Sequence, residues 1–352
     1  MLCGSEFAGN AEEMILGSIR NMGACLPVAL MATMSVTVMA QTCTTQARMQ
    51  GATRTALADT ALQLGTAVKS GDANAVKAAT VPEYANNFAP IEYVIHNTSD
   101  KLKGDTLRVT QVYLLDVSAR KSGDTSEADF TCPLQGTTAE TDFSFSSLPA
   151  GLYGFAMVEA TGGDRPWLLA FVLEQENGAW KMGGFYPHAR TAAGKDGLWY
   201  WNAARTNAKT KPWLAWMQYD EANELLRPAS FVSSTSLDKL MAEQHAGAPP
   251  QLSDGISAQT PLVVKAADGQ EFHFTSMTNE NAADDTGLSF VLHFATDALP
   301  TAEANRARNL AAAKAMLAAH PELRQGYSSV YVFGDVAGQN PSVLTLKMTE
   351  IP

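Results

Sequence analysis

The chain has 352 residues, of which 46% are hydrophobic, 17% are charged and 8% are aromatic. This globular composition excludes a disordered chain and a bundle of membrane helices. Lysine and arginine total 25 against 36 aspartates and glutamates, so the formal net charge is −11. An acidic chain is poorly suited to a phosphate backbone, and we therefore expect no nucleic-acid partner.

Residues 1–40 are predicted to be a secretory signal peptide that is cleaved after Ala40. Arg20 precedes an almost uncharged run, and Val38 and Ala40 occupy the two positions before the cut where small residues are required. The protein is then secreted or periplasmic, and it meets a membrane only transiently, through this peptide. A retained anchor is the alternative, although the apolar run is slightly short for a spanning helix.

Translation is expected to begin at Met14. Three glutamates within residues 1–13 do not suit the positively charged start of a signal peptide. Residues 1–13 are therefore predicted to be absent from the protein as it is made.

Two of the four cysteines, Cys3 and Cys25, lie in the segment predicted to be lost. Cys43 and Cys132 remain, and in an oxidising compartment they are candidates for a disulfide. Such a bond closes a loop of about 90 residues, worth roughly 4–5 kcal/mol in the chain-entropy model. A pair of unbonded thiols is the alternative.

The first predicted elements after the signal peptide are two helices. Leu57, Ala61, Leu64 and Val68 recur at spacings of four, three and four, which predicts a helix over 55–69 that ends at Gly71. Asp72 is a suitable N-cap for a second helix, which Pro82 is expected to end. Strands are then predicted over 107–117, near residue 130, and over 141–146, 152–160 and 167–188, the last as a hairpin.

The hairpin is the best-specified element, because Asn177 and Gly178 suit a two-residue turn that needs positive φ at both positions. Counting back from this turn places Trp167 opposite His188, with Tyr186 on the same face. An imidazole, an indole and a phenol on one apolar face have the composition of a ligand pocket.

We considered His188 and Tyr186 as acid or base at this position, with Asp142 as a carboxylate partner for the histidine. The alternative is an aromatic core corner that contains a hydrogen-bonded histidine. Trp199 and Trp201 also have two interpretations: they cover a ligand pocket or stack on a sugar, or they pack against the preceding sheet. No residue is assigned a catalytic role.

Residues 196–246 are predicted to form a helical segment, followed by a linker over 247–258. Asp196 caps the first helix, Pro212 begins the second, and Thr235 with Asp238 resembles a capping box for the third. Residues 259–352 are predicted to form a smaller α+β domain with the order βββαββ, whose first hairpin turns at Asp268 and Gly269.

The segment "TALADTALQLGTAVKSGDANAVKAATVPEY" and the hairpin "ENGAWKMGGF" resemble the nuclear transport factor 2-like (NTF2-like, or SnoaL-like) superfamily. The resemblance covers roughly residues 50–190. It implies an α+β domain over 41–195, in which helices pack on a curved antiparallel sheet around a conical pocket. Members include enzymes and domains without activity, and no catalytic residue of the enzymes matches a position here. The whole chain also resembles secreted bacterial proteins with no assigned function.

Sequence motifs for common chemistry are absent: the chain has no GxSxG elbow, HExxH, paired CxxC, P-loop or strand-linked GxGxxG. The histidines have no metal-ligand spacing, so we predict no metal site and no cofactor. His273 and His293 lie in predicted strands, where a structural or solvated role is more common. Asp284 and Asp285, near Asn279 and Asn281, suggest either a calcium loop or a solvated loop.

The sequence therefore predicts a secreted or periplasmic two-domain α+β protein that acts as a non-catalytic binding or interaction module. Its partner is a small apolar or aromatic ligand, or another envelope protein. The alternative is a small-molecule isomerase, dehydratase or hydrolase that uses the conical pocket.

Overall fold

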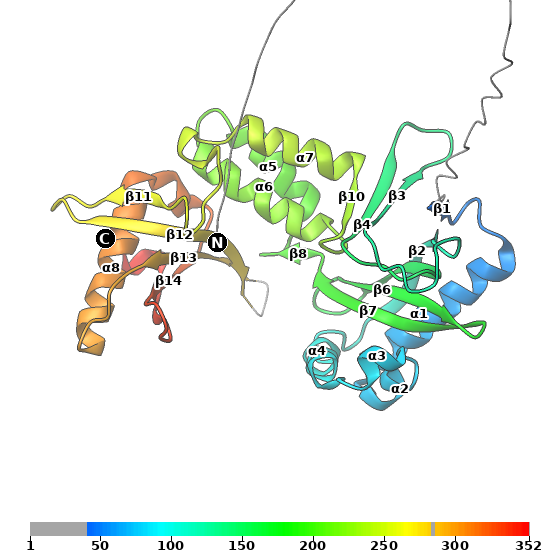
Figure 1. The fold of residues 1–352 in the computed structure, drawn as a ribbon. Helices are drawn as coiled ribbons and strands as arrows, with labels where there is room; N and C mark the ends of the chain where they lie inside the picture. Colours follow the sequence, from blue (N-terminus) through cyan, green and yellow to red (C-terminus); the bar gives the residue numbers. More distant parts are fainter. Residues whose placement is uncertain (1–40, 283–285, 352) are drawn as a thin grey trace, which may run out of the picture. The chain divides into compact units, whose positions relative to one another are not determined.

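A computed structural model describes residues 41–282 and 286–351 of the chain. The predicted signal peptide, with its cleavage site after Ala40, and the two acidic residues Asp284 and Asp285 lie outside the described residues. Within them the protein has eight α-helices and four β-sheets, which confirms the predicted mixed α+β class (Figure 1).

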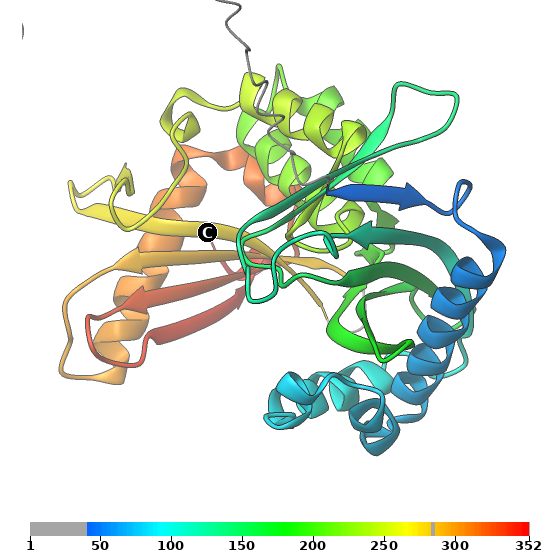
Figure 2. The same ribbon diagram turned by 45° about the vertical axis from the view of Figure 1, so that its right-hand side comes forward.

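The first large sheet has five antiparallel strands in the order β1-β2-β5-β6-β7. Its strands are β1 (Thr42–Thr45), β2 (Thr106–Asp116), β5 (Leu152–Thr161), β6 (Trp167–Glu176) and β7 (Ala179–Ala189). Four helices accompany it: α1 (Gly51–Ser70), α2 (Ala73–Ala78), α3 (Pro82–Ala85) and α4 (Ala89–Ser99). Helix α1 lies along one face of this sheet in both views (Figures 1 and 2).

Helix α1 forms for the reasons that its sequence predicts. The four apolar residues at helical spacing are all buried, and Gly71 ends the helix with a φ of +71°, where a Cβ is disfavoured. Asp72 caps α2 by accepting a hydrogen bond from the Ala75 amide at 3.0 Å. Helix α2 ends at Ala78, before Pro82 as predicted, and Pro82 itself begins α3, where its missing amide donor carries no penalty.

The opposite face of the sheet packs against a small sheet with the order β10-β4-β3. Its strands are β10 (Val232–Ser234), β4 (Glu140–Phe145) and β3 (Ala128–Pro133). Tyr113, Phe143 and Phe155 pack with ring centres 5.1–6.5 Å apart between the two sheets. The predicted disulfide is confirmed, and it joins Cys43 of β1 to Cys132 of β3.

A β-bulge interrupts the hairpin of β6 and β7. Asn177 and Gly178 have φ values of 50° and 83°, which confirms the predicted turn, and Leu173 pairs with Met182 as counted. The next pair is Val172 with Gly184, so Gly183 is an extra residue on β7. A one-residue shift moves every later side chain of that strand to the other face.

The rest of the described chain forms four α-helices and a second five-stranded sheet. After a short hairpin of β8 (Thr191–Ala192) and β9 (Lys195–Asp196) come α5 (Gly197–Asn207), α6 (Pro212–Leu226) and α7 (Thr235–Ala246). The sheet runs β11 (Leu262–Lys265), β12 (Glu271–Asn281), β13 (Leu288–Ala295), β14 (Ser329–Asp335) and β15 (Ser342–Lys347), with α8 (Ala302–Ala319) as the crossover between parallel β13 and β14. The order of elements is the predicted βββαββ.

Helix caps follow the sequence with one exception. Asp196 caps α5 by accepting from the Trp199 amide at 2.8 Å, and Pro212 begins α6. The predicted cap of α7 at Thr235 is wrong, because the hydroxyl of Ser234 accepts the Leu237 amide instead.

The helical segment shares one hydrophobic core with the second sheet. Tyr200, Trp213 and Met217 belong to the same cluster of buried residues as Phe274 and Phe290. Leu252, inside the predicted linker, is buried in this cluster as well. Buried residues of this second core therefore begin at Ala192 and continue past residue 250, except that Ala229 and Val232 belong to the core between the first sheet and the small sheet.

Candidate functional site

The predicted corner of Trp167, Tyr186 and His188 does not assemble. Because of the bulge at Gly183, Trp167 pairs with Ala189, and His188 pairs with Leu168. Trp167 packs against the cluster that lies under α1, whereas the Tyr186 ring packs edge-on against Phe231, 5.1 Å away, on the opposite face. The predicted pairing of Trp167 with His188 is therefore wrong, and so is a shared face for the three side chains.

His188 has an environment that opposes general-base catalysis. Its Nε2 is buried and has no hydrogen-bond partner within the described residues. Burial, with a smaller contribution from the charge of Arg190, lowers the pKa of His188 to about 4. Asp142, the proposed partner, accepts a hydrogen bond from Thr131 at 2.7 Å. His188 is therefore a neutral residue at pH 7 and carries no ion pair with Asp142.

The two candidate tryptophans of α5 have different surroundings. Trp201 is buried, donates from Nε1 to Glu243 at 2.8 Å, and is covered by the Arg205 guanidinium 4.3 Å from its ring centre. Trp199 is 45% exposed, and the ammonium of Lys195 lies 5.6 Å from its ring centre. Trp201 is therefore part of the core, whereas the exposed ring of Trp199 can contact a ligand.

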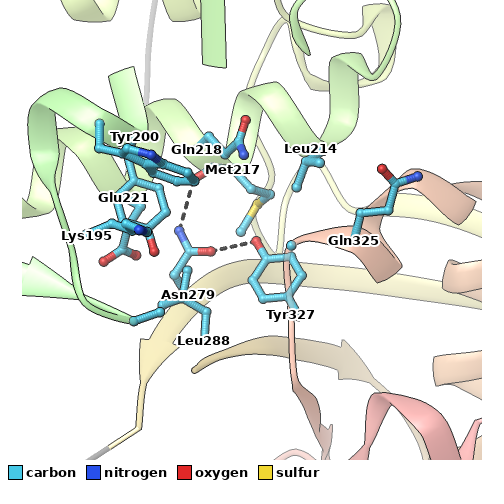
Figure 3. Close-up of a pocket in the computed structure, with 13 residues that line it drawn as sticks. Lys195, Tyr200, Leu214, Met217, Gln218, Glu221, Asn279, Leu288, Gln325 and Tyr327 are labelled. Carbon is cyan, nitrogen blue, oxygen red and sulfur yellow. Dashed lines mark hydrogen bonds between the residues drawn. The ribbon is translucent and has the colours of Figure 1, made fainter. Parts of the chain in front are cut away.

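Trp199 lines a cavity of about 210 Å³, which we call the tyrosine cavity (Figure 3). Its wall combines side chains of α5 and α6 with residues of β12, β13 and the segment that leads into β14. The aromatic residues are Trp199, Tyr200 and Tyr327, and the apolar ones include Leu214, Met217 and Leu288. The polar ones are Lys195, Gln218, Glu221, Asn279 and Gln325.

Asn279 reaches the cavity because β12 also contains a bulge. Phe274 pairs with Phe294, but the next pair is Ser276 with His293, so Thr275 is an extra residue. Phe274 before the bulge and Met277 after it both face the core, and Asn279 follows Met277 on that face. Strict alternation from Phe274 would have turned Asn279 toward solvent.

A hydrogen-bond chain fixes Asn279 at the cavity wall (Figure 3). The Tyr327 hydroxyl donates to Asn279 Oδ1 at 2.6 Å, and Asn279 Nδ2 donates to the Met217 carbonyl at 3.0 Å. Asn279 Nδ2 also donates to Asp220, which lies outside the cavity lining, at 3.3 Å. Burial, with a smaller contribution from Glu224, raises the pKa of Asp220 to about 6. Burial also raises the pKa of Tyr327 well above its usual value, so the phenol stays protonated.

Tyr200 is held on the facing side of the cavity. Its hydroxyl donates to the Ala192 carbonyl at 2.8 Å. Glu221 adds a carboxylate that is 7% exposed. The surrounding core thus fixes the positions of the Tyr200 and Glu221 side chains at the cavity wall.

A second cavity of about 320 Å³, the arginine cavity, contains Trp167 and Arg190. Arg190 donates to the Leu225 carbonyl at 3.0 Å, and burial lowers its pKa from the usual arginine value. Glu159 and Asp196 line the same cavity. Two carboxylates beside one guanidinium give this cavity no clear preference for an anion.

An unpredicted histidine–aspartate pair lies on the second sheet. His293 Nδ1 is 3.0 Å from Asp335 Oδ2, and its ring stacks on Phe333 with ring centres 4.4 Å apart. Neither the tyrosine cavity nor the arginine cavity includes these side chains, and we do not place the site there.

Within the described residues, no group of three or more histidine, cysteine, aspartate or glutamate side chains has the geometry to hold a metal ion. None of the helices in that part of the chain combines the length and hydropathy that a membrane crossing needs. No family model, curated protein or solved structure matches the chain.

Proposed function

We propose that the protein is a non-catalytic binding module that takes a small molecule into the tyrosine cavity. The observation that carries this proposal is the hydrogen-bond chain of Tyr327, Asn279 and Asp220, which fixes Tyr327 and Asn279 at the wall of a cavity that combines aromatic, apolar and polar side chains. Concave sites of this kind, mostly apolar with a few fixed polar groups, are the usual form of small-molecule sites.

The enzymatic alternative has less support. Its acid and base were Tyr186 and His188, and these residues line neither the tyrosine cavity nor the arginine cavity. The neutral, buried imidazole of His188 is a poor proton acceptor near pH 7.

The compartment that we propose is the periplasm or the extracellular space. The disulfide of Cys43 and Cys132 favours an oxidising environment, because cytosolic reductants keep most thiols reduced. We also propose that the first sheet with α1, α2 and α4 has the NTF2-like arrangement. The support is the helix that ends at Gly71, the capped helix after Asp72 and the antiparallel sheet that follows.

Binding can be tested by ligand-observed NMR with the mature chain and a library of small metabolites. We expect at least one chemical class to bind, with backbone amide shifts that concentrate at the tyrosine cavity. A matched variant, Asn279→Ala, should weaken that binding. Failure of every class to bind, or binding that Asn279→Ala leaves unchanged, would contradict the proposal.

A further inference from the structure

We infer that the arginine cavity is a second binding site, and that its ligand is a free α-amino acid with an apolar side chain. Among the described residues, the arginine and tyrosine cavities share no lining residue. The inference therefore goes beyond the proposed function and does not depend on it. Three features of the wall support this ligand: an anchored guanidinium, a carboxylate of opposite charge and an apolar surface.

The guanidinium of Arg190 is held in place and is suited to a carboxylate. Arg190 directly follows β7, is half-buried, and donates from Nη1 to the Leu225 carbonyl at 3.0 Å. This hydrogen bond uses one of the five N–H donors of the guanidinium, which binds a carboxylate best through two parallel hydrogen bonds. Because the side chain is already anchored, a bound carboxylate costs little additional rotamer entropy.

The charges of the cavity favour a zwitterion. In the described part of the chain, the charged side chains that line it are Glu159, Arg190 and Asp196. Glu159 forms an ion pair with Arg108, whose Nη2 lies 2.9 Å from Glu159 Oε2. Arg190 and Asp196 are then one positive and one negative charge. An anion is repelled by Asp196 and a cation by Arg190, whereas a molecule with both charges is attracted by each of them.

Asp196 can accept from an ammonium group while it caps α5. Its Oδ1 accepts from the Trp199 amide at 2.8 Å, and an ionised carboxylate has about four lone-pair sites in all. Burial lowers the pKa of Arg190, and the charges of Glu159 and Asp196 offset part of that shift, so both carboxylates are near the guanidinium. Oppositely charged groups that lie near each other match the ammonium and carboxylate of an α-amino acid, which are attached to one carbon.

Much of the remaining wall suits an apolar side chain. Four large apolar residues line the cavity: Trp167, Leu198, Leu225 and Leu226. The Arg165 guanidinium lies 5.7 Å from the Trp167 ring centre and is not among the lining residues. The volume of about 320 Å³ is near the lower end of the range of roughly 300–1,000 Å³ that is typical of small-molecule pockets. The cavity therefore fits a single amino acid better than a peptide.

The inference can be tested by isothermal titration calorimetry of residues 41–352 with leucine and phenylalanine. Two matched probes each lack one charge of leucine: isocaproate has no ammonium group, and isoamylamine has no carboxylate. We expect leucine or phenylalanine to bind, and both matched probes to bind at least about tenfold more weakly, because each leaves one charged group of the wall without a partner. Amino acids are kept out of the metabolite library that tests the tyrosine cavity, so the two experiments report on different cavities.

Two matched variants locate the binding. Asp196→Asn removes the negative charge and keeps a good N-cap for α5. It should weaken leucine binding at least about fivefold and strengthen isocaproate binding, an opposite change that a loss of folded protein cannot produce. Asp72→Asn is the control, because Asp72 also caps a helix, accepting the Ala75 amide at 3.0 Å, and is not among the residues that line the arginine cavity. It should leave the affinity for both probes unchanged.

The possible failures are distinguishable. If neither amino acid binds while a library compound binds at the tyrosine cavity, the inference is wrong and the proposed function stands. If leucine binds as expected and no library compound does, the inference stands and the proposed function is wrong. Isocaproate or isoamylamine that binds as tightly as leucine would overturn the zwitterion. If Asp196→Asn and Asp72→Asn have the same effect on leucine binding, the amino-acid site lies elsewhere and the inference is overturned.

Discussion

The hairpins of β6 with β7 and of β12 with β13 each contain one extra residue, with opposite consequences for function. In the first, Gly183 moves Tyr186 and His188 away from the face of Trp167, and the corner predicted as a pocket does not form. In the second, Thr275 keeps Asn279 on the buried face, where it meets Tyr327. In both hairpins the strand register, more than the residue type, determines which polar side chains reach a cavity.

The two regions also differ in what stabilises them. The first has a disulfide between its two sheets, and the second depends on a continuous core and on buried hydrogen bonds. Four perturbations should separate these contributions.

Removing the disulfide should have the largest effect. In the chain-entropy model, a variant with both Cys43→Ser and Cys132→Ser loses about 4–5 kcal/mol of unfolding free energy, because the bond closes a loop of about 90 residues. Urea denaturation measures this loss. Reductant should shift the unmodified chain by a similar amount and leave the double variant unaffected; a double variant as stable as the unmodified chain would contradict the account.

Inserting one alanine between Gly184 and Phe185 should cost at least about 3 kcal/mol, because the inserted residue takes the place opposite Phe171, turns Phe185 away from this stacked partner and exposes large apolar side chains. Gly183→Ala is the matched control. A Cβ at this position would lie 3.8 Å from the Val172 carbonyl oxygen, an ordinary contact, so it should cost less than about 1 kcal/mol. Equal losses for the insertion and the substitution would show that the strand register after Gly184 contributes no stability.

The pH dependence of stability should differ in sign between the two regions. His188 has a pKa of about 4 in the folded chain, below the value of about 6.5 in the unfolded chain. Between these values only the unfolded chain binds the proton, so acidification destabilises the fold by up to about 3 kcal/mol. His188→Leu should remove this slope from urea titrations across that range.

Asp220 should make the free energy of unfolding change with pH in the opposite direction. Its folded pKa of about 6 exceeds the unfolded value of 3.8, so between these values the folded chain binds more protons. Its contribution is then lost as the pH rises through about 6, also by up to about 3 kcal/mol. Asp220→Asn should remove that loss and keep an acceptor for Asn279. Unchanged slopes in both variants would refute the two assignments.

Removing one hydroxyl should have the smallest effect. Tyr327→Phe deletes the donor to Asn279 Oδ1 and leaves a buried acceptor with one partner fewer, which should cost about 1–2 kcal/mol. Tyr331→Phe, in β14 and half-buried, should cost less than about 0.5 kcal/mol. Thermal unfolding of both variants checks this difference, and equal shifts would argue against a fixed chain at the cavity wall.

Local signals in the sequence predicted much of the fold. The four apolar residues of α1, the Gly71 and Asp72 caps and the Asn177-Gly178 turn act within a few residues, so the sequence pattern alone identifies them. Helix α4 was missed because its 11 residues contain a proline near the start and only two of them are buried. Neither bulge was predicted, because a strict alternation of side chains between the two faces assumes that each residue of one strand pairs with one residue of its neighbour.

The candidate site was harder to predict. Of the named candidates, Trp199 lines the tyrosine cavity and Trp167 lines the arginine cavity. Asn279 was considered only as part of a calcium loop, and Tyr327 was not considered at all. These two residues meet only because β12 packs against the segment before β14. No local sequence pattern predicts this tertiary contact.

The most direct test of the central claim is a ¹⁹F NMR titration of residues 41–352 labelled with 5-fluorotryptophan, using the tightest-binding compound of the metabolite library. The six tryptophans report on both regions at once, and single Trp→Phe variants assign their signals. The account predicts that the Trp199 signal shifts with saturation while those of Trp167 and Trp180 stay fixed. A shift of Trp167 with an unchanged Trp199 would move the site to the arginine cavity and contradict the account.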